Sequence, residues 1–133
     1  MEVWLEIDFW LILRALSLIA LIGFILVGLA FIITPHLFTG ENIAGGSALW
    51  HSLSIAFMST VTIIALLVAL NPRIYWPMLL PLAIGKLTSS IISLYWYSML
   101  ASMTHTMLLL NSIVDGSIGV IALLLYIIAR RFK

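Results

Sequence analysis

Two charged residues interrupt long apolar stretches of this chain. Lys86 lies within residues 75–97, and Asp115 lies within residues 107–129. A charged side chain at the centre of a membrane helix costs roughly 2.5–3.5 kcal/mol on insertion scales, so it usually faces the protein interior beside a partner. An ammonium group and a carboxylate can hold two helices in register, or they can relay protons in a wet cavity. These two residues are therefore the first candidates for a site.

The depths of the two residues predict that they meet. Lys86 lies about 16 Å along its helix from Tyr75 at the inner face of the membrane, at ~1.5 Å per residue. Asp115 lies about 12 Å from Met107 at the outer face. In a hydrocarbon core about 30 Å thick, Asp115 is therefore about 18 Å from the inner face, close to the depth of Lys86. Consecutive antiparallel helices are usually neighbours. The sequence therefore predicts an intramembrane ion pair between Lys86 and Asp115.

Small and polar residues share the helix faces of this pair. They recur three, four or seven residues from each charge, which places them on the same side of their helices. We expect a polar lining of Ser89, Ser90, Ser93, Asn111 and Ser112, joined by serine and threonine hydroxyls from residues 52–62. Gly116 and Gly119 have the spacing that lets helix backbones approach closely. Two interpretations stay open: a structural pair that fixes register, or a relay or ligand site for an anionic or quinone-like molecule.

The histidines form a second group. We expect His36, His51 and His105 to lie on one side of the membrane together with Glu41. Imidazole nitrogens suit copper, zinc, nickel or haem iron. However, these residues lie on separate connections with no short spacing such as H-x-x-x-H. The simpler interpretation is interfacial histidines without a metal, so we expect no haem, copper or other resident cofactor. A lipid or a quinone remains compatible with the sequence.

The composition defines the environment of these residues. The chain has 133 residues, of which 64% are hydrophobic and 8% are charged, and it contains no cysteine. A soluble domain has about 25% charged residues, so this chain cannot coat a water-facing surface. The absence of cysteine excludes disulfides and thiolate metal sites. The net charge of +1 gives no basic field for nucleic acid. We therefore expect an integral membrane protein that does not bind nucleic acid.

Four apolar segments are long enough to cross a bilayer, which takes about 20 helical residues. Prolines or an Asn-Pro pair end the first two segments. Pro77 falls in the first turn of the third segment, whereas Pro81 lies deeper and predicts a kink. The fold class is all-α: one domain, residues 1–133, forming an antiparallel four-helix membrane bundle. Its spans cover about residues 10–34, 48–70, 75–97 and 107–129.

The distribution of basic residues predicts the orientation. With four spans, both termini and the connection near residue 71 share one side of the membrane. That side holds five of the six Lys and Arg residues, namely Arg14, Arg73, Arg130, Arg131 and Lys133. The connections on the other side, residues 35–47 and 98–106, hold none. Because cytoplasmic connections collect Lys and Arg, we expect a multi-pass cell-membrane protein with both termini in the cytoplasm.

Several short stretches together carry a family resemblance. They are residues 31–35 (FIITP), 50–53 (WHSL), 71–73 (NPR), 85–90 (GKLTSS) and 114–116 (VDG). The layout resembles small four-span bacterial and archaeal membrane proteins that are broadly DoxX-like. This resemblance implies a subunit beside a quinone-linked oxidoreductase, and it carries over no catalytic residue.

The sequence therefore predicts a noncatalytic accessory subunit of a larger membrane complex, such as a respiratory or other redox complex, bordering a lipid or quinone site. Its expected partners are other integral membrane subunits and membrane lipids. Two alternatives stay open. The outer-side histidines would serve a haem- or metal-binding electron-transfer subunit, or Lys86 and Asp115 would serve a small proton or solute carrier.

Overall fold

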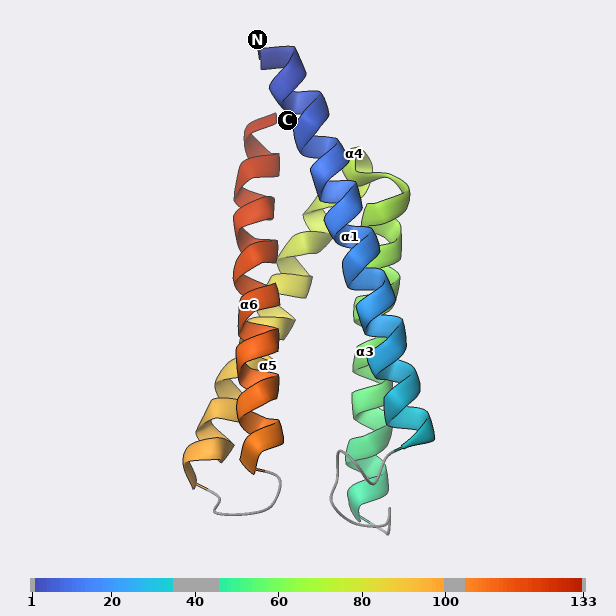
Figure 1. The fold of residues 1–133 in the computed structure, drawn as a ribbon, viewed down its shortest axis with the longest axis vertical. Coiled ribbons are helices and arrows are strands. Elements are labelled where there is room, and N and C mark those ends of the chain that lie inside the picture. The colour runs from blue at the N-terminus through green and yellow to red at the C-terminus, as the bar shows by residue number, and fades with distance from the viewer. Residues whose placement is uncertain (1, 35–45, 100–104, 133) are drawn as a thin grey trace.

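The computed structural model describes residues 2–34, 46–99 and 105–132, which are helical almost throughout and contain no strand. Each apolar segment that precedes a connection ends at a proline or at polar residues. In chain order the elements are α1 (Glu2–Ile33), α3 (Gly46–Leu70), α4 (Pro72–Tyr75), the 3₁₀ turn η1 (Trp76–Met78), α5 (Leu79–Met99), α6 (His105–Ala129) and the 3₁₀ turn η2 (Arg130–Phe132) (Figure 1).

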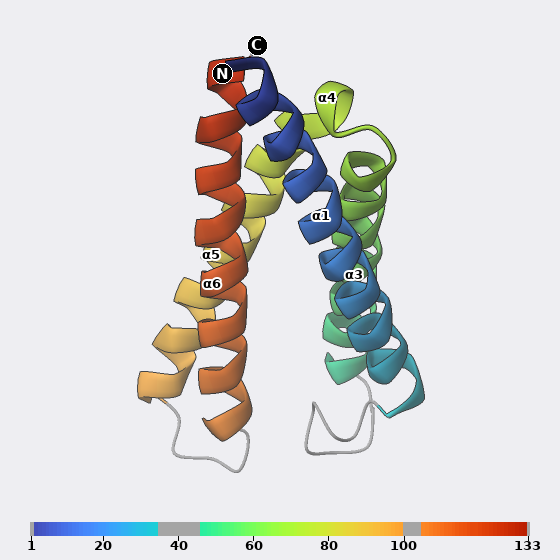
Figure 2. The same ribbon diagram turned by 45° about the horizontal axis from the view of Figure 1, so that its top comes forward.

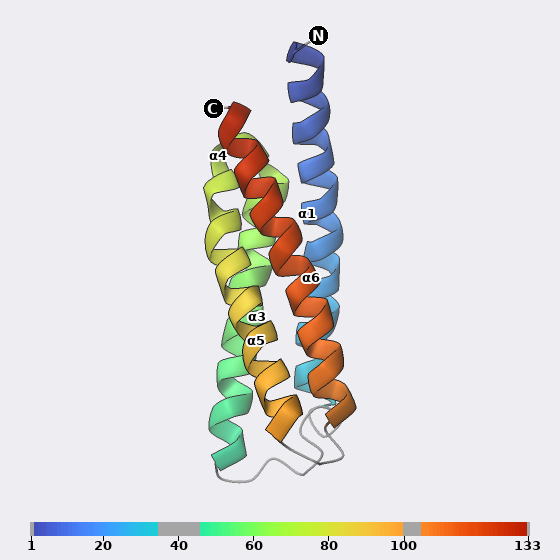
Figure 3. The ribbon, with the colours of Figure 1, turned by 90° about the vertical axis from the view of Figure 1, so that its left-hand side faces the viewer.

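The long helices form two antiparallel hairpins. Helix α1 packs along α3, and α5 packs along α6, while α4 and η1 connect one hairpin to the other. The hairpins approach each other at the end that holds both termini and α4, and they diverge toward the opposite end (Figures 1 and 2). Seen from the side, all four run along one axis, and the amino end of α1 extends past the carboxyl end of the chain (Figure 3). The bundle therefore has a termini end and a loop end.

The prediction of an all-helical protein with four membrane-spanning segments is confirmed for the part of the chain that the structure describes. Four segments are long and apolar enough to cross a membrane. They are Asp8–Ile33, Leu49–Leu70, Pro72–Met99 and Thr106–Phe132. The chain is therefore a multi-pass helical membrane protein by length and composition.

Within the third span, the start of the long helix differs from the expectation. Helix α5 begins at Leu79 rather than near Tyr75, and the residues before it form α4 and the turn η1. Pro77 lies inside the 3₁₀ turn η1, whose end is closed by the Leu79 N–H donating to the Trp76 carbonyl. Pro81 is then the third residue of α5, where a backbone N–H has no intrahelical partner in any case. The physical reason to expect a kink at Pro81 is thereby removed.

Two clusters of buried apolar residues hold the hairpins together. One lies around Phe24 and contains Phe24, Met58, Val61, Ala65, Leu82, Ala83 and Ala122. The other lies at the termini end and contains Phe9, Trp10, Leu13, Val68, Leu79 and Ala129. Aromatic rings extend the second cluster, with the Phe9 and Phe132 ring centroids 5.2 Å apart. The rest of the surface exposes Leu, Ile, Val and Met side chains from every long helix, as a lipid environment requires.

The hydroxyls of α3 do not join the polar lining that the sequence suggested. Four of them bond to the carbonyl four residues earlier on the same helix, at 2.7–2.9 Å, namely Ser54, Ser59, Thr60 and Thr62. A Ser or Thr side chain in an apolar environment can satisfy its hydroxyl in this way without an interhelical partner. The expectation is therefore wrong for these four residues, because their own backbone is the nearer acceptor.

Candidate functional site

The two intramembrane charges meet between α5 and α6. Lys86 Nζ donates a hydrogen bond to Asp115 Oδ1 at 2.7 Å, and only 5% and 7% of the two side chains are exposed. A charge-assisted bond of this length in a medium of low dielectric is among the stronger polar contacts a protein makes. The geometry agrees with the antiparallel register that the sequence predicts for the two helices. Lys86 and Asp115 thus form a buried, mutually neutralised pair.

Aromatic rings from the other hairpin cover the same ammonium group. Lys86 Nζ lies 5.0 Å from the ring centroid of Phe24 on α1 and 5.4 Å from that of Phe57 on α3. A cation over an aromatic face gains up to about 2 kcal/mol when both are desolvated. Side chains from α1, α3 and α6 therefore surround the ammonium group of Lys86 on α5, so all four long helices that the structure describes meet at this point. The pair joins α5 to α6, and the rings join this hairpin to the other.

Polar contacts continue from the ion pair toward the loop end of α5 and α6. Ser90 Oγ donates to the Ser112 carbonyl at 2.7 Å and lies 3.3 Å from the Ser112 hydroxyl. Beside this contact, Asn111 Nδ2 donates to Ser93 Oγ at 2.8 Å and to Ser89 Oγ at 3.3 Å. The five residues that the sequence grouped as a polar lining thus lie at one helix contact. Such interhelical bonds average about 0.6 kcal/mol each in membrane proteins.

Two glycines of α6 allow this close contact. A Cβ atom placed on Gly119 would lie 2.7 Å from Leu87 Cγ and 3.0 Å from the Leu87 backbone nitrogen. A Cβ on Gly116 would lie 2.8 Å from Ser90 Oγ. Real Cβ atoms do not approach other atoms so closely, so α5 occupies the space that side chains at these positions would need. The small-residue spacing predicted from the sequence therefore serves the α5–α6 contact.

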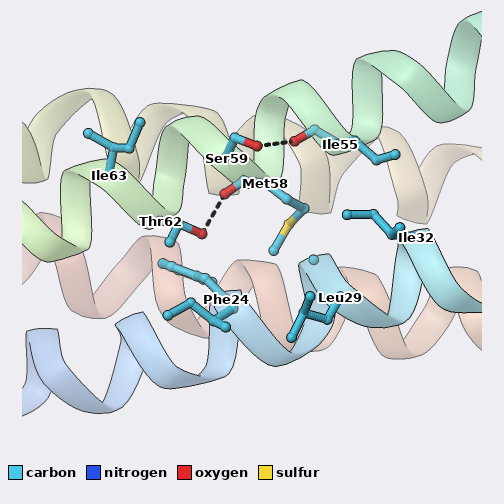
Figure 4. Close-up of a pocket in the computed structure, with 10 residues that line it drawn as sticks. Phe24, Leu29, Ile32, Ile55, Met58, Ser59, Thr62 and Ile63 are labelled. Atoms are coloured by element: carbon cyan, nitrogen blue, oxygen red, sulfur yellow. Dashed lines mark hydrogen bonds between the residues drawn. The ribbon is translucent and has the colours of Figure 1, made fainter.

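A groove of about 290 Å³ lies on the α1–α3 hairpin. Apolar side chains from both helices line it, including Leu29 and Ile32 from α1 and Ile55 and Ile63 from α3 (Figure 4). The hydroxyls of Ser59 and Thr62 in its wall bond to backbone carbonyls of α3 rather than facing the groove unsatisfied (Figure 4). A surface of this kind suits a hydrocarbon chain. Neither member of the ion pair belongs to the lining, although Phe24 borders both features.

His51 has a structural partner in the chain. Its Nε2 lies 2.7 Å from the Phe31 carbonyl oxygen, so Nε2 carries the proton and donates. Phe31 is in the last turn of α1, where carbonyl groups lack intrahelical donors. The backbone N–H and hydroxyl of Thr34 both donate to the Ala30 carbonyl at 2.9 Å. His51 and Thr34 together therefore cap the carboxyl end of α1.

The other members of the predicted histidine group cannot be placed against it. His36 and Glu41 lie outside the described residues, and so does the side chain of His105, whose backbone opens α6. Among the residues whose positions are described, no three His, Asp or Glu side chains come close enough to hold a metal ion.

Substitution of His51 tests the cap. His51→Ala should lower the free energy of unfolding by about 1 kcal/mol, because the Phe31 carbonyl loses its donor at a helix end. His51→Gln keeps an amide N–H within similar reach and should recover most of the loss. Thermal melting in detergent, followed by circular dichroism, measures both. If the alanine variant has the same melting temperature as the wild type, the hydrogen bond of His51 contributes nothing to stability.

A comparison with protein-family models, curated proteins and solved structures finds no match to this chain. A proposal for its function therefore depends on the ion pair, the α5–α6 contact and the apolar exterior.

Proposed function

We propose that this chain is a noncatalytic subunit whose helices pack against other spans of a larger membrane complex. The observation that carries the proposal is the small buried share of α1. In its most apolar stretch, α1 buries 11% of its residues, whereas each of the other three spans buries 28%. The exposed positions include Ile19 at 67% and Ile22 at 59%. A helix with so few contacts in its own bundle has a wide apolar face available for spans of a partner.

The use of polar groups inside the bundle supports a packing role. In the described residues, every buried side-chain nitrogen and oxygen atom has a hydrogen-bond partner. The charges of Lys86 and Asp115 neutralise each other, and the aromatic rings cover the ammonium group. A solute path needs polar groups that are available to the solute. Here the buried polar side chains that the structure describes are bonded to partners within the protein instead.

The resemblance to DoxX-like proteins extends the proposal to the kind of complex. It supports a redox complex that handles quinones, in which this chain braces its neighbours. The apolar groove between α1 and α3 is the place where the tail of a lipid or quinone would lie. In this arrangement the chain supplies an apolar surface and no reacting group.

Photocrosslinking in native membranes tests the packing role. Benzoylphenylalanine at position 19 or 22 on α1 should yield discrete adducts with other membrane proteins, because this face meets the partner. The same probe in place of Ile91 on α5, which is 66% exposed, is the matched control and should yield mainly lipid adducts. Lipid adducts alone from both helices would contradict the proposal, and so would identical protein adducts from both.

We also propose that both termini face the cytoplasm, because the connections on the other side contain no Lys or Arg. A cysteine introduced at position 41 should react with a membrane-impermeant thiol reagent from outside the cell. A cysteine added after Lys133 should react only after the membrane is opened. The chain contains no native cysteine, so each label reports a single site. The reverse pattern of labelling would overturn the orientation.

A further inference from the structure

The arginines of the chain gather at the termini end of the bundle. Arg14 lies on α1, Arg73 on α4, and Arg130 and Arg131 on η2, and all four are exposed. Figure 1 shows α4 and the carboxyl end of the chain toward the end of the bundle where α1 begins. Arg73 already makes a contact within the chain. We therefore define the basic collar as the other three residues, Arg14, Arg130 and Arg131.

Buried neighbours place the collar at the termini end of the bundle. Arg14 directly follows Leu13, and Arg130 directly follows Ala129. Leu13 and Ala129 are both fully buried, at 0% exposure, and belong to the same apolar cluster. Tyr126 packs against this cluster, as do other amphipathic aromatic residues that favour the membrane interface. Arg14 and Arg130 therefore each adjoin a residue of the cluster against which these aromatic side chains pack.

The acidic residues near the amino terminus precede Arg14 in the sequence of α1. Asp8 is exposed and lies about 9 Å closer to the amino end of the helix than Arg14, at ~1.5 Å per residue. Glu2 and Glu6 precede Asp8 in the sequence. Along α1, the positive charge of Arg14 thus lies closer to the middle of the apolar span than the negative charge of Asp8.

We propose that the basic collar binds the headgroups of anionic phospholipids in the leaflet at the termini end. A guanidinium group donates two parallel hydrogen bonds to a phosphate and keeps its charge at any physiological pH. Anionic lipids add a net charge that zwitterionic lipids lack. An arginine near such a surface strengthens binding about fivefold. Three arginines at one end of the bundle therefore discriminate between the two lipid classes.

Lipid retention by the purified full-length chain tests the collar. The protein is equilibrated with equal amounts of phosphatidylglycerol and phosphatidylcholine in nanodiscs, and its bound lipids are counted by native mass spectrometry. The wild type should retain severalfold more phosphatidylglycerol, and high salt should reduce this preference because the contact is partly exposed. Substitution of all three arginines by glutamine should bring the ratio of the two lipids close to one.

Two control variants identify the cause of the preference. Substitution of the same three arginines by lysine keeps the charge and should keep most of the selectivity. Asp8→Asn removes the nearest described carboxylate and should leave the preference unchanged or increase it. Equal lipid ratios in the wild type and the glutamine variant would overturn the proposal, as would a wild type without any preference. The latter result would assign the collar to an acidic segment of a protein partner instead.

Discussion

Lys86→Met and Asp115→Asn should each lower the free energy of unfolding by about 3–5 kcal/mol, the typical cost of breaking a buried ion pair by removing one partner. Each substitution leaves the other group without its partner among apolar side chains, with 5% or 7% of its side chain exposed. Lys86→Met also removes the cation–π contacts between the ammonium group and the rings of Phe24 and Phe57. Denaturant titration in mixed micelles measures the loss.

The double variant distinguishes a specific pair from two independent sites. Lys86→Met combined with Asp115→Asn should recover part of the summed loss, because neither charge is left alone. The exchanged pair, Lys86→Asp with Asp115→Lys, should be more stable than either half of the exchange. Ser117→Ala is the matched control on α6: its hydroxyl is exposed and bonds only to the Ile113 carbonyl, so little should change. Strictly additive losses would mean that the two charges do not interact in the membrane.

Gly119→Ala should destabilise the protein by about 1–3 kcal/mol, the usual cost of adding atoms to a filled helix contact. The new methyl group would lie 2.7 Å from Leu87 Cγ and 3.0 Å from the Leu87 backbone nitrogen, so α5 and α6 must separate. Gly23→Ala is the same substitution at an open position, with no other side chain or distant backbone atom within 4 Å. It should stabilise α1 by up to about 1 kcal/mol, because alanine favours helix over glycine.

The two glycine variants are expected to shift thermal melting in opposite directions in the same detergent. Leu87→Ala combined with Gly119→Ala should recover part of the loss, because the flexible end of Leu87 is removed while its backbone nitrogen remains. A Gly119→Ala variant that melts at or above the wild-type temperature would show that the α5–α6 contact is looser than the structure describes.

The position of the ion pair follows from sequence alone because few arrangements can satisfy a charge in an apolar helix. A helix rises by a constant amount per residue, so the distance of Lys86 and Asp115 from the ends of their spans converts directly into depth. Their shared depth and the adjacency of consecutive antiparallel helices left one simple partner for each. The same periodicity placed Ser90 and Asn111 on the faces that meet, and the number and approximate extent of the spans followed from apolar length.

The start of the third helix depended on a competition that periodicity does not reveal. Pro77 has no backbone N–H to donate. Both the first turn of an α-helix and a 3₁₀ turn tolerate this missing donor. In the structure, the connection from α3 uses residues 72–78 for two short turns, and α5 begins only at Leu79. The choice depends on how the two hairpins pack around the buried side chain of Leu79.

Only the tertiary structure decided what covers Lys86 and where the remaining polar groups bond. Phe24 and Phe57 are two of the six phenylalanines of the chain, and nothing in their spacing distinguishes them, because contact with Lys86 depends on how one hairpin docks on the other. Four hydroxyls of α3 bond to their own backbone, and the His51 ring reaches the end of α1. A polar side chain has several acceptors within reach, and the packing of the helices selects among them.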